Sequence, residues 1–282
     1  MSIKAKVGST WHEVEPSVKV SGNWKPVIKA SIKVGGIWQV IYEYTYVYTF
    51  DSGAHFNVDL DTLSLDKTHN VKIVIPSNGT ILASSTSQYA LRTGSGYGGT
   101  LTIENNGIIL GRGGDGGSGG LSGSGGNAGA SGGGGTSGGD CIYIECPTIM
   151  DNNGTLSGGG GGSGGGGSGG GSSGFPSYGN YYAGGGGGGG GAPYGLGGAK
   201  GSGSEQRTGS PGSQAGISSG GAGGAGSAHS EGAGSAGATG GAVGVVGNTA
   251  SWGTGSFRSA GGAGGAVGET YFNPQNYQII LL

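Results

Sequence analysis

The feature that most constrains this chain is a glycine-rich stretch in its second half. Of the 78 glycines, 67 lie between residues 111 and 268, in runs such as 158–162 and 184–191. Glycine loses more conformational entropy on folding than other residues and has no side chain to bury, so the stretch favours neither α-helices nor an ordinary apolar core. If it folds, its backbone must hold it together.

One regular conformation suits this composition. The polyproline II helix has about three residues per turn and no internal hydrogen bonds, so its N–H and C=O groups point sideways. Chains without side chains can approach closely enough to pair these groups laterally, which satisfies nearly all buried peptides. We therefore predict a bundle of polyglycine II helices. Collagen is a poor alternative, because it needs glycine at every third position and abundant proline, and this chain has only 8 prolines.

A flexible Gly/Ser linker is the serious alternative to an ordered bundle. Three islands argue against it, because residues 141–150, 175–183 and 248–259 carry aromatic and β-branched side chains that a spacer does not need. The second and third of these islands, together with Tyr194 and Arg207, combine aromatic side chains and arginine with serine, asparagine and glycine. Binding loops on rigid scaffolds have this composition. The alternative is that the aromatic side chains cap the ends of the bundle. The predicted receptor-binding residues are Phe175, Tyr178, Tyr181, Tyr182, Tyr194, Arg207, Trp252, Phe257 and Arg258.

The first 45 residues contain a threefold repeat. Each copy has an alternating apolar strand, a glycine-containing turn and a second strand that begins near Trp11, Trp24 or Trp38, and the tryptophans are 13 and 14 residues apart. Each copy predicts a β-hairpin. A single hairpin is too small for its own core, so the tryptophans either fill the interior of a small sheet or bind a partner. Three equivalent hairpins indicate a pseudo-threefold object that could attach to a threefold partner.

Residues 44–110 alternate apolar and polar side chains. Asn-Gly turns at Asn78, Asn106 and Asn153 follow strand-like runs, which predicts stacked rungs or hairpins. The C-terminal sequence YQIILL predicts a strand that returns to this β region. We expect an all-β protein with essentially no α-helix.

These patterns divide the chain into parts. Residues 1–110 are predicted to be a β-rich attachment domain and connector. Residues 111–268 are predicted to be the polyglycine II receptor-binding domain, with a β insert at about 140–156, and residues 269–282 the returning strand. Cys141 and Cys146 read as parts of one strand with side chains on opposite faces, which predicts two buried thiols and no disulfide.

The sequence indicates no enzyme, cofactor or metal site. No glycine is followed by lysine as a P-loop requires, no helical segment follows a dinucleotide-type glycine motif, and no serine has a nucleophile signature. Asp59 and Asp61 would share one face of a strand, as the paired carboxylates of a glycosidase do, but their segment is predicted to be short and exposed. The histidines show no ligand spacing; they are His12, His55, His69 and His229.

Charge and hydropathy limit the partners and the compartment. The formal net charge is −2, with no basic footprint for nucleic acid. No apolar run approaches the length of a membrane span, and the N-terminus lacks the apolar core of a signal peptide. We expect synthesis in a cytoplasm and no membrane insertion.

Taken together, these features resemble the long-tail-fibre tip adhesins of T-even-type bacteriophages, over essentially the whole chain. The resemblance implies that the N-terminal domain caps a trimeric long-tail-fibre protein, one adhesin per trimer, at the fibre tip of the virion. It also implies packed polyglycine II helices whose loops bind an outer-membrane protein or lipopolysaccharide of the host. The most specific blocks are GRGGDGGSGG at 111–120, GGGGGSGGGGSGGG at 158–171, AGGGGGGGGAPYG at 183–195 and GGAGGAVG at 261–268.

Two alternatives come from other classes of protein. An ice-binding polyglycine II protein would need a flat, repetitive face of small residues and disulfide staples, whereas the islands here are bulky and irregular. A silk-like structural protein would have longer, more uniform repeats and no distinct N-terminal domain.

Overall fold

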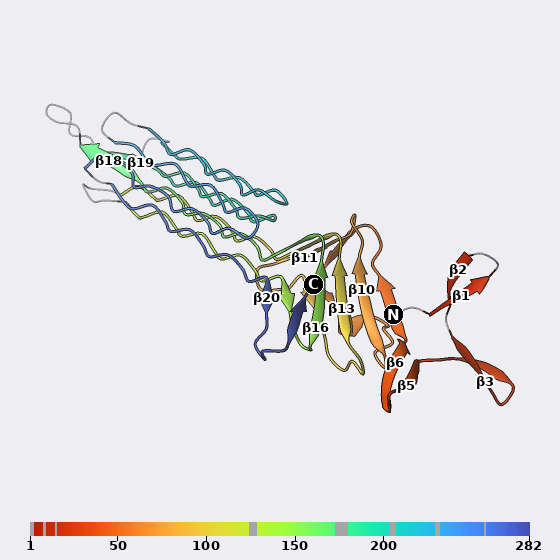
Figure 1. Ribbon diagram of the computed structural model, residues 1–282. Coiled ribbons are helices and arrows are strands. Elements are labelled where there is room, and N and C mark those ends of the chain that lie inside the picture. Colours follow the sequence, from red (N-terminus) through yellow and green to blue (C-terminus); the bar gives the residue numbers. More distant parts are fainter. Residues whose placement is uncertain are drawn as a thin grey trace.

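The computed structural model describes residues 3–7, 10–14, 16–123, 129–172, 180–203, 207–228, 232–256 and 258–282. Hairpins at the N-terminal end, a block of parallel sheets and a long bundle of glycine-rich segments follow one another in space (Figure 1). The described regular structure is β except for one 3₁₀ turn, η1 (Leu60–Thr62). The all-β prediction is therefore confirmed.

The three predicted hairpins are present. Each is a separate antiparallel two-stranded sheet, and the turns at Ser21-Gly22 and Gly35-Gly36 have positive φ at both central residues. Such turns match the right-handed twist of the flanking strands, which is why glycine stands there. The pairs are β1 (Ile3–Val7) with β2 (Thr10–Val14), β3 (Ser17–Val20) with β4 (Asn23–Pro26), and β5 (Lys29–Val34) with β6 (Ile37–Glu43).

The next strands form three parallel sheets. The first contains β7 (Thr45–Thr49), β10 (Asn70–Ile75), β13 (Leu101–Asn105), β16 (Thr148–Asn152) and β21 (Ile279–Leu281). The second contains β8 (Ala54–Phe56), β11 (Thr80–Leu82), β14 (Ile108–Leu110) and β17 (Thr155–Ser157). The third contains β9 (Val58–Asp59), β12 (Leu91–Arg92), β15 (Ile142–Tyr143) and β20 (Tyr271–Phe272). The chain visits the three sheets in turn, so it winds as a β-solenoid whose coils are the predicted rungs, stacked in parallel and not as hairpins.

The solenoid core follows from the alternating pattern. Strands β10 and β13 bury every second side chain, and the inward residues of all three sheets meet in one apolar cluster that includes Ile73, Ile103 and Met150. The Asn-Gly turns are the corners between the first and second sheets. They stack through backbone bonds, because the N–H of Ile108 donates to the carbonyl of Gly79 (3.1 Å) and that of Thr155 to Gly107 (2.8 Å).

The cysteine segment differs from its prediction. Residues 141–150 are not one strand, because β15 and β16 belong to different sheets and a corner of the solenoid lies between them. Cys141 and Cys146 therefore both face the core, contrary to the predicted opposite faces. Both are buried free thiols, as predicted. Burial raises the pKa of each thiol, which keeps both in the protonated form.

The glycine-rich stretch consists of two excursions from the solenoid. Residues 111–140 leave after β14 and return at β15, and residues 158–270 leave after β17 and return at β20. Both excursions thus run from the second sheet to the third, in consecutive coils. The C-terminal strand β21 then pairs in parallel with β16.

Straight segments run alternately away from the solenoid and back to it (Figure 1). Neighbouring segments bond laterally with a period of three residues, which is the pattern that polyglycine II packing requires. For example, N–H groups of 111–123 donate at 2.8–2.9 Å to carbonyls of 158–172, joining Gly114 to Gly160, Gly117 to Ser163 and Gly120 to Gly166. The segments are 111–123, 129–140, 158–172, 183–192, 195–203, 207–216, 219–228, 232–242, 246–254 and 259–268.

Two segments form the interior of the bundle. Residues 158–170 and 183–193 are buried throughout, because neighbouring segments surround them on every side. All three residues of each turn then point at another backbone, which explains why the longest glycine runs of the sequence fall here. Ser163 interrupts one of these glycine runs. Its buried hydroxyl is satisfied there, because it donates to the carbonyl of Gly189 (3.0 Å) or Ala238 (2.5 Å).

Candidate functional site

The end of the bundle far from the solenoid, called here the outer end, gathers segments that are distant in sequence. It carries the hairpin of β18 (Gly169–Ser172) and β19 (Asn180–Ala183) (Figure 1). The N–H of Gly170 donates to the carbonyl of Thr254 (3.1 Å), and the N–H of Thr254 to that of Ala233 (2.7 Å). The N–H of Gly184, next to β19, donates to the carbonyl of Arg207 (3.1 Å). Backbone bonds thus bring three of the predicted binding regions to one end.

Trp252 and Arg258 flank a turn at this outer end. The N–H of Gly253 donates to the carbonyl of Ser259 (3.1 Å), and Gly255 takes a positive φ of 97° between them. The Trp252 side chain is 62% exposed, and Arg258 is also exposed. This turn therefore presents a large apolar ring and a cation to solvent while its backbone stays anchored.

The other predicted receptor residues, apart from Tyr194, divide into three groups. Arg207 is half-buried at the outer end, where its carbonyl also accepts from the Ser227 hydroxyl (2.8 Å). Tyr181 and Tyr182 belong to β19, opposite Gly171 and Gly170 in the hairpin register. Phe175, Tyr178 and Phe257 lie outside the described residues.

Tyr194 lies away from the predicted receptor residues of the outer end. Its N–H donates to the carbonyl of Gly216 (3.2 Å), and the preceding Pro193 accepts from the N–H of Gly113 (2.9 Å), next to the start of the bundle. Gly111, two residues earlier, is bonded to Ser157 of the solenoid. Tyr194 therefore lies at the inner end, and the structure does not bring it together with Trp252 and Arg258.

The predicted attachment residues lie on the hairpins. Trp24 is 70% exposed and Trp38 is 68% exposed, so these two rings do not fill an interior. Only the backbone of Trp11 is described. Each tryptophan has the same cross-strand partner type in its register, and the pairs are Lys6 with Trp11, Lys19 with Trp24 and Lys33 with Trp38. The sequence repeat is thus a repeat in structure, with exposed Val18, Val20, Ile32, Val34, Ile37 and Val40 on the second and third copies.

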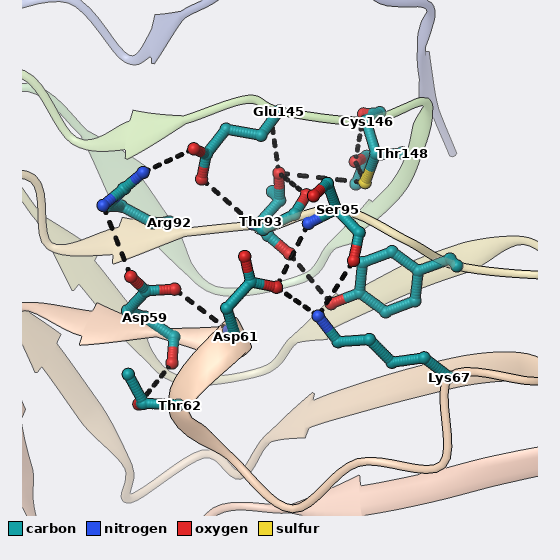
Figure 2. Close-up of polar contacts among 12 residues, drawn as sticks. Asp59, Asp61, Thr62, Lys67, Arg92, Thr93, Ser95, Glu145, Cys146 and Thr148 are labelled. Atoms are coloured by element: carbon teal, nitrogen blue, oxygen red, sulfur yellow. Dashed lines mark hydrogen bonds and ion pairs between the residues drawn. The ribbon is translucent and has the colours of Figure 1, made fainter.

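Asp59 and Asp61 belong to a polar cluster on the solenoid (Figure 2). They do not share a strand face as expected, because Asp59 ends β9 and Asp61 lies in η1, where the Asp59 carboxylate accepts its N–H (2.9 Å). Asp61 pairs with Lys67 and accepts the N–H of Ser95 (3.1 Å), and Lys67 also donates to the Ser95 carbonyl (3.0 Å). These contacts join the corners of successive coils.

Arg92 connects two further carboxylates of the same cluster. It pairs with Asp59 (3.3 Å) and with Glu145, and Glu145 also accepts the N–H of Gly94 (3.1 Å) (Figure 2). Each carboxylate named here pairs with a cation and accepts a backbone N–H, which suits a structural network of the solenoid.

This network predicts acid-sensitive stability. The hydrogen bond from Lys67 lowers the pKa of Asp61, and that from Lys72 lowers the pKa of Glu104. A lowered folded-state pKa contributes stability above the unfolded value, about 4, and that contribution is lost as pH falls through the folded-state pKa. Lys67→Met should therefore lower the melting temperature by about 2–4 °C at pH 7, since this partly exposed pair contributes at most about 1 kcal/mol.

The difference should be smaller at pH 2 than at pH 7, because protonation of Asp61 removes the ion pair as pH falls through its lowered folded-state pKa. The hydrogen bond from Lys67 to the Ser95 carbonyl does not depend on that carboxylate. Thermal unfolding at the two pH values measures it, with Lys200→Met, an exposed lysine of the bundle, as control. A Lys67→Met deficit that is as large at pH 2 as at pH 7 would show that lost packing, and not the ion pair, is responsible.

Within the part of the chain that the structure describes, no group of three or more His, Cys, Asp or Glu residues could hold a metal ion. In the same residues there is no helix with the length and hydropathy of a membrane span.

Comparison with known proteins gives two similarities. Residues 43–279 match a protein family described as phage tail fibre adhesin Gp38. Among solved structures, the chain resembles one titled "Crystal structure of the gp37-gp38 adhesin tip complex of the bacteriophage S16 long tail fiber", with a TM-score of 0.51 and 22% identity. That similarity covers 85% of this chain and 79% of the other, and at this identity it supports the fold. No curated protein matches.

Proposed function

Since the chain belongs to the phage tail fibre adhesins, we propose that it forms the tip of a long tail fibre and binds a host receptor through the outer end of its bundle. The receptor is an outer-membrane protein or a lipopolysaccharide of the host bacterium. The family match favours this role over the ice-binding and silk-like alternatives. We propose that the protein is synthesised in the host cytoplasm before it is assembled into the virion. The proposed role involves no catalytic step, cofactor, nucleic-acid partner or membrane insertion.

The observation that carries the proposal is the gathering of Trp252, Arg258, Arg207 and the β18–β19 hairpin at one end of a rigid scaffold. Tryptophan and arginine are the residue types most enriched at the energetic centres of interfaces. The scaffold is held by backbone bonds between glycines, so side chains at its tips can vary without loss of packing. Phe175, Tyr178, Tyr181, Tyr182 and Phe257 are proposed members of the same site, and Tyr194 is not.

The opposite end of the molecule is proposed to bind the fibre. The similar solved structure is a complex of gp38 with gp37, which supports a tail-fibre protein as partner. Three equivalent hairpins allow one adhesin to meet a trimer, with Trp11, Trp24 and Trp38 each docking on one protomer. Residues 1–110 then attach and connect, residues 111–268 bind the receptor, and residues 269–282 complete the solenoid.

Truncation of the exposed ring at the outer-end turn tests the receptor assignment. Trp252→Ala should abolish or redirect binding to host cells at an unchanged melting temperature, because the Trp252 ring is exposed. Exchange of the whole stretch 248–259 would not serve, because Ala250 and Ser259 are buried and bonded to neighbouring segments of the bundle. Adsorption of phage or of fluorescent protein to cells measures the effect. The matched control is Leu196→Ala, which removes an apolar side chain of similar exposure (52%) near the inner end.

Two results would relocate or refute the site. If Trp252→Ala and Arg258→Ala bind cells normally while Tyr181→Ala or Tyr182→Ala does not, binding is assigned to the β18–β19 hairpin. If all four variants bind as the parent protein does, the aromatic-loop mechanism is wrong.

A further inference from the structure

The three Asn-Gly corners of the solenoid are alike in sequence but not in structure. Each joins a strand of the first sheet to a strand of the second, in successive coils. In an Asn-Gly pair the backbone nitrogen of glycine can attack the side-chain carbonyl carbon of asparagine, because glycine has no side chain in the way. The nitrogen attacks only after it has lost its proton, so a hydrogen bond from the glycine N–H protects the asparagine. The pairs are Asn78-Gly79, Asn106-Gly107 and Asn153-Gly154.

Two of the three glycines have a bonded N–H. The N–H of Gly79 donates to the carbonyl of Pro76 (2.8 Å), and that of Gly107 donates to Oδ1 of Asn105 (3.1 Å). Both glycines are also buried. A base must therefore break a hydrogen bond, and reach a buried atom, before either nitrogen becomes a nucleophile.

Gly154 lacks both kinds of protection. It is half-buried beside the exposed Asn153, and no oxygen of the described residues accepts its N–H. Asn152 holds the position that Asn105 holds one coil earlier, since the two are register partners. However, Oδ1 of Asn152 accepts a hydrogen bond from Nδ2 of Asn105 (2.7 Å) and not from Gly154. The acceptor that protects the preceding corner is thus engaged elsewhere in this one.

We propose that Asn153 is a site of spontaneous deamidation in the folded protein. A base removes the N–H proton of Gly154, and the nitrogen bonds to Cγ of Asn153. The Cγ–Nδ2 bond breaks, and the leaving nitrogen takes a proton from water and departs as ammonia. One water molecule then opens the succinimide ring to an aspartate or an isoaspartate. The net change is the uptake of water and the loss of ammonia, with no oxidation.

Asn106 provides the matched comparison inside the same molecule. Its Nδ2 donates to the Glu104 carboxylate (2.7 Å), just as Nδ2 of Asn153 donates to that of Asp151 (3.0 Å). Both side chains are therefore held by a carboxylate two residues earlier, and the glycine N–H is what differs. We expect Asn153 to deamidate about tenfold faster than Asn106, the factor that corresponds to one broken hydrogen bond of about 1.4 kcal/mol.

The reaction would change the corner that leads into the bundle. The N–H of Asn153 donates to the carbonyl of Asn105 and that of Thr155 to Gly107, both at 2.8 Å. An isoaspartate adds a methylene group to the backbone between these two bonds, and an aspartate places a second carboxylate beside Asp151. Strand β17 follows directly and continues into the buried segment 158–170.

Peptide mapping by mass spectrometry tests the proposal. The full-length folded protein is incubated in mildly alkaline buffer prepared with ¹⁸O-labelled water, and it is then digested in ordinary water. The peptide that contains Asn153 should acquire one labelled oxygen in place of its amide nitrogen. The peptides that contain Asn78 and Asn106 should react about tenfold more slowly, because their glycine N–H groups are bonded.

The unfolded chain is the control for local sequence. In urea, all three asparagines should react at similar rates, because no fold protects any of them. Asn153→Gln should remove the reaction from that peptide, since the larger ring forms far more slowly. The proposal is overturned if Asn153 stays intact in the folded protein, if Asn78 or Asn106 reacts as fast there, or if the unfolded chain shows the same preference for Asn153.

Discussion

Replacing Gly187 with valine should unfold the glycine bundle. Gly187 lies in a buried interior segment, and a Cβ there would stand 2.1 Å from the carbonyl oxygen of Gly198 and 2.7 Å from its carbon. Neither backbone can move away without breaking lateral bonds to its other neighbours. We expect a loss of about 3 kcal/mol or more in the free energy of unfolding, at or above the usual cost of overpacking.

Hydrogen exchange and thermal unfolding measure this effect. Interior amides of residues 158–167 should exchange slowly in the parent protein and fast in Gly187→Val, because their protection requires the intact bundle. Uniformly fast exchange in the parent protein would instead favour the flexible linker.

Two adjacent glycines provide a matched control for the same mechanism. A Cβ at Gly135 would lie 2.1 Å from the carbonyl oxygen of Gly162, whereas one at Gly134 would lie 3.5 Å from that of Ala263, an ordinary contact. Gly135→Ala should therefore be strongly destabilising. Gly134→Ala should be neutral or stabilise by about 0.5 kcal/mol, because alanine restricts the unfolded chain. Equal melting temperatures for the two variants would contradict the packing argument.

Removal of any one hairpin tryptophan should weaken attachment to the fibre by roughly 30-fold in Kd, or about 2 kcal/mol, the loss expected for an interface anchor. Trp24→Ala and Trp38→Ala should leave the melting temperature unchanged, because both rings are exposed in the free protein. The equivalent register of Trp11 predicts a similar loss for Trp11→Ala. Binding of purified variants to the trimeric fibre tip, measured by surface plasmon resonance, gives these values.

Ile280→Ala is the control for the attachment test, because it removes an exposed apolar side chain from the last coil of the solenoid, away from the hairpins. It should bind the fibre normally. Normal binding by all three tryptophan variants would remove the hairpins from the interface. Unfolding of the free protein by each of them would assign the tryptophans to its core.

The stacked rings of Tyr143 and Phe272 on the outer face of the third sheet were missed from the sequence, although a signal for them exists. Three strands of this sheet contribute an inward residue followed by an outward one, in the dipeptides Leu91-Arg92, Ile142-Tyr143 and Tyr271-Phe272. These pairs are short and lie far apart in the chain. Their equivalence becomes visible only when the coils are aligned, because the glycine excursions separate them.

The local and compositional properties of this protein follow from its sequence alone. The hairpins follow from alternating strands and turns such as Ser21-Gly22, whose positive φ is a local requirement. Backbone packing follows from glycine runs such as 184–191, because no other residue type leaves room for a neighbour on every side.

Which distant segments meet is known only from the folded chain. It winds the rungs in parallel, inserts the glycine stretch as two excursions, and places Trp252 and Tyr194 at opposite ends of the bundle. This follows because neighbouring glycine-rich segments bond laterally with the same period of three residues. Successive glycines therefore look alike in the sequence, and only the fold shows which segment each one faces.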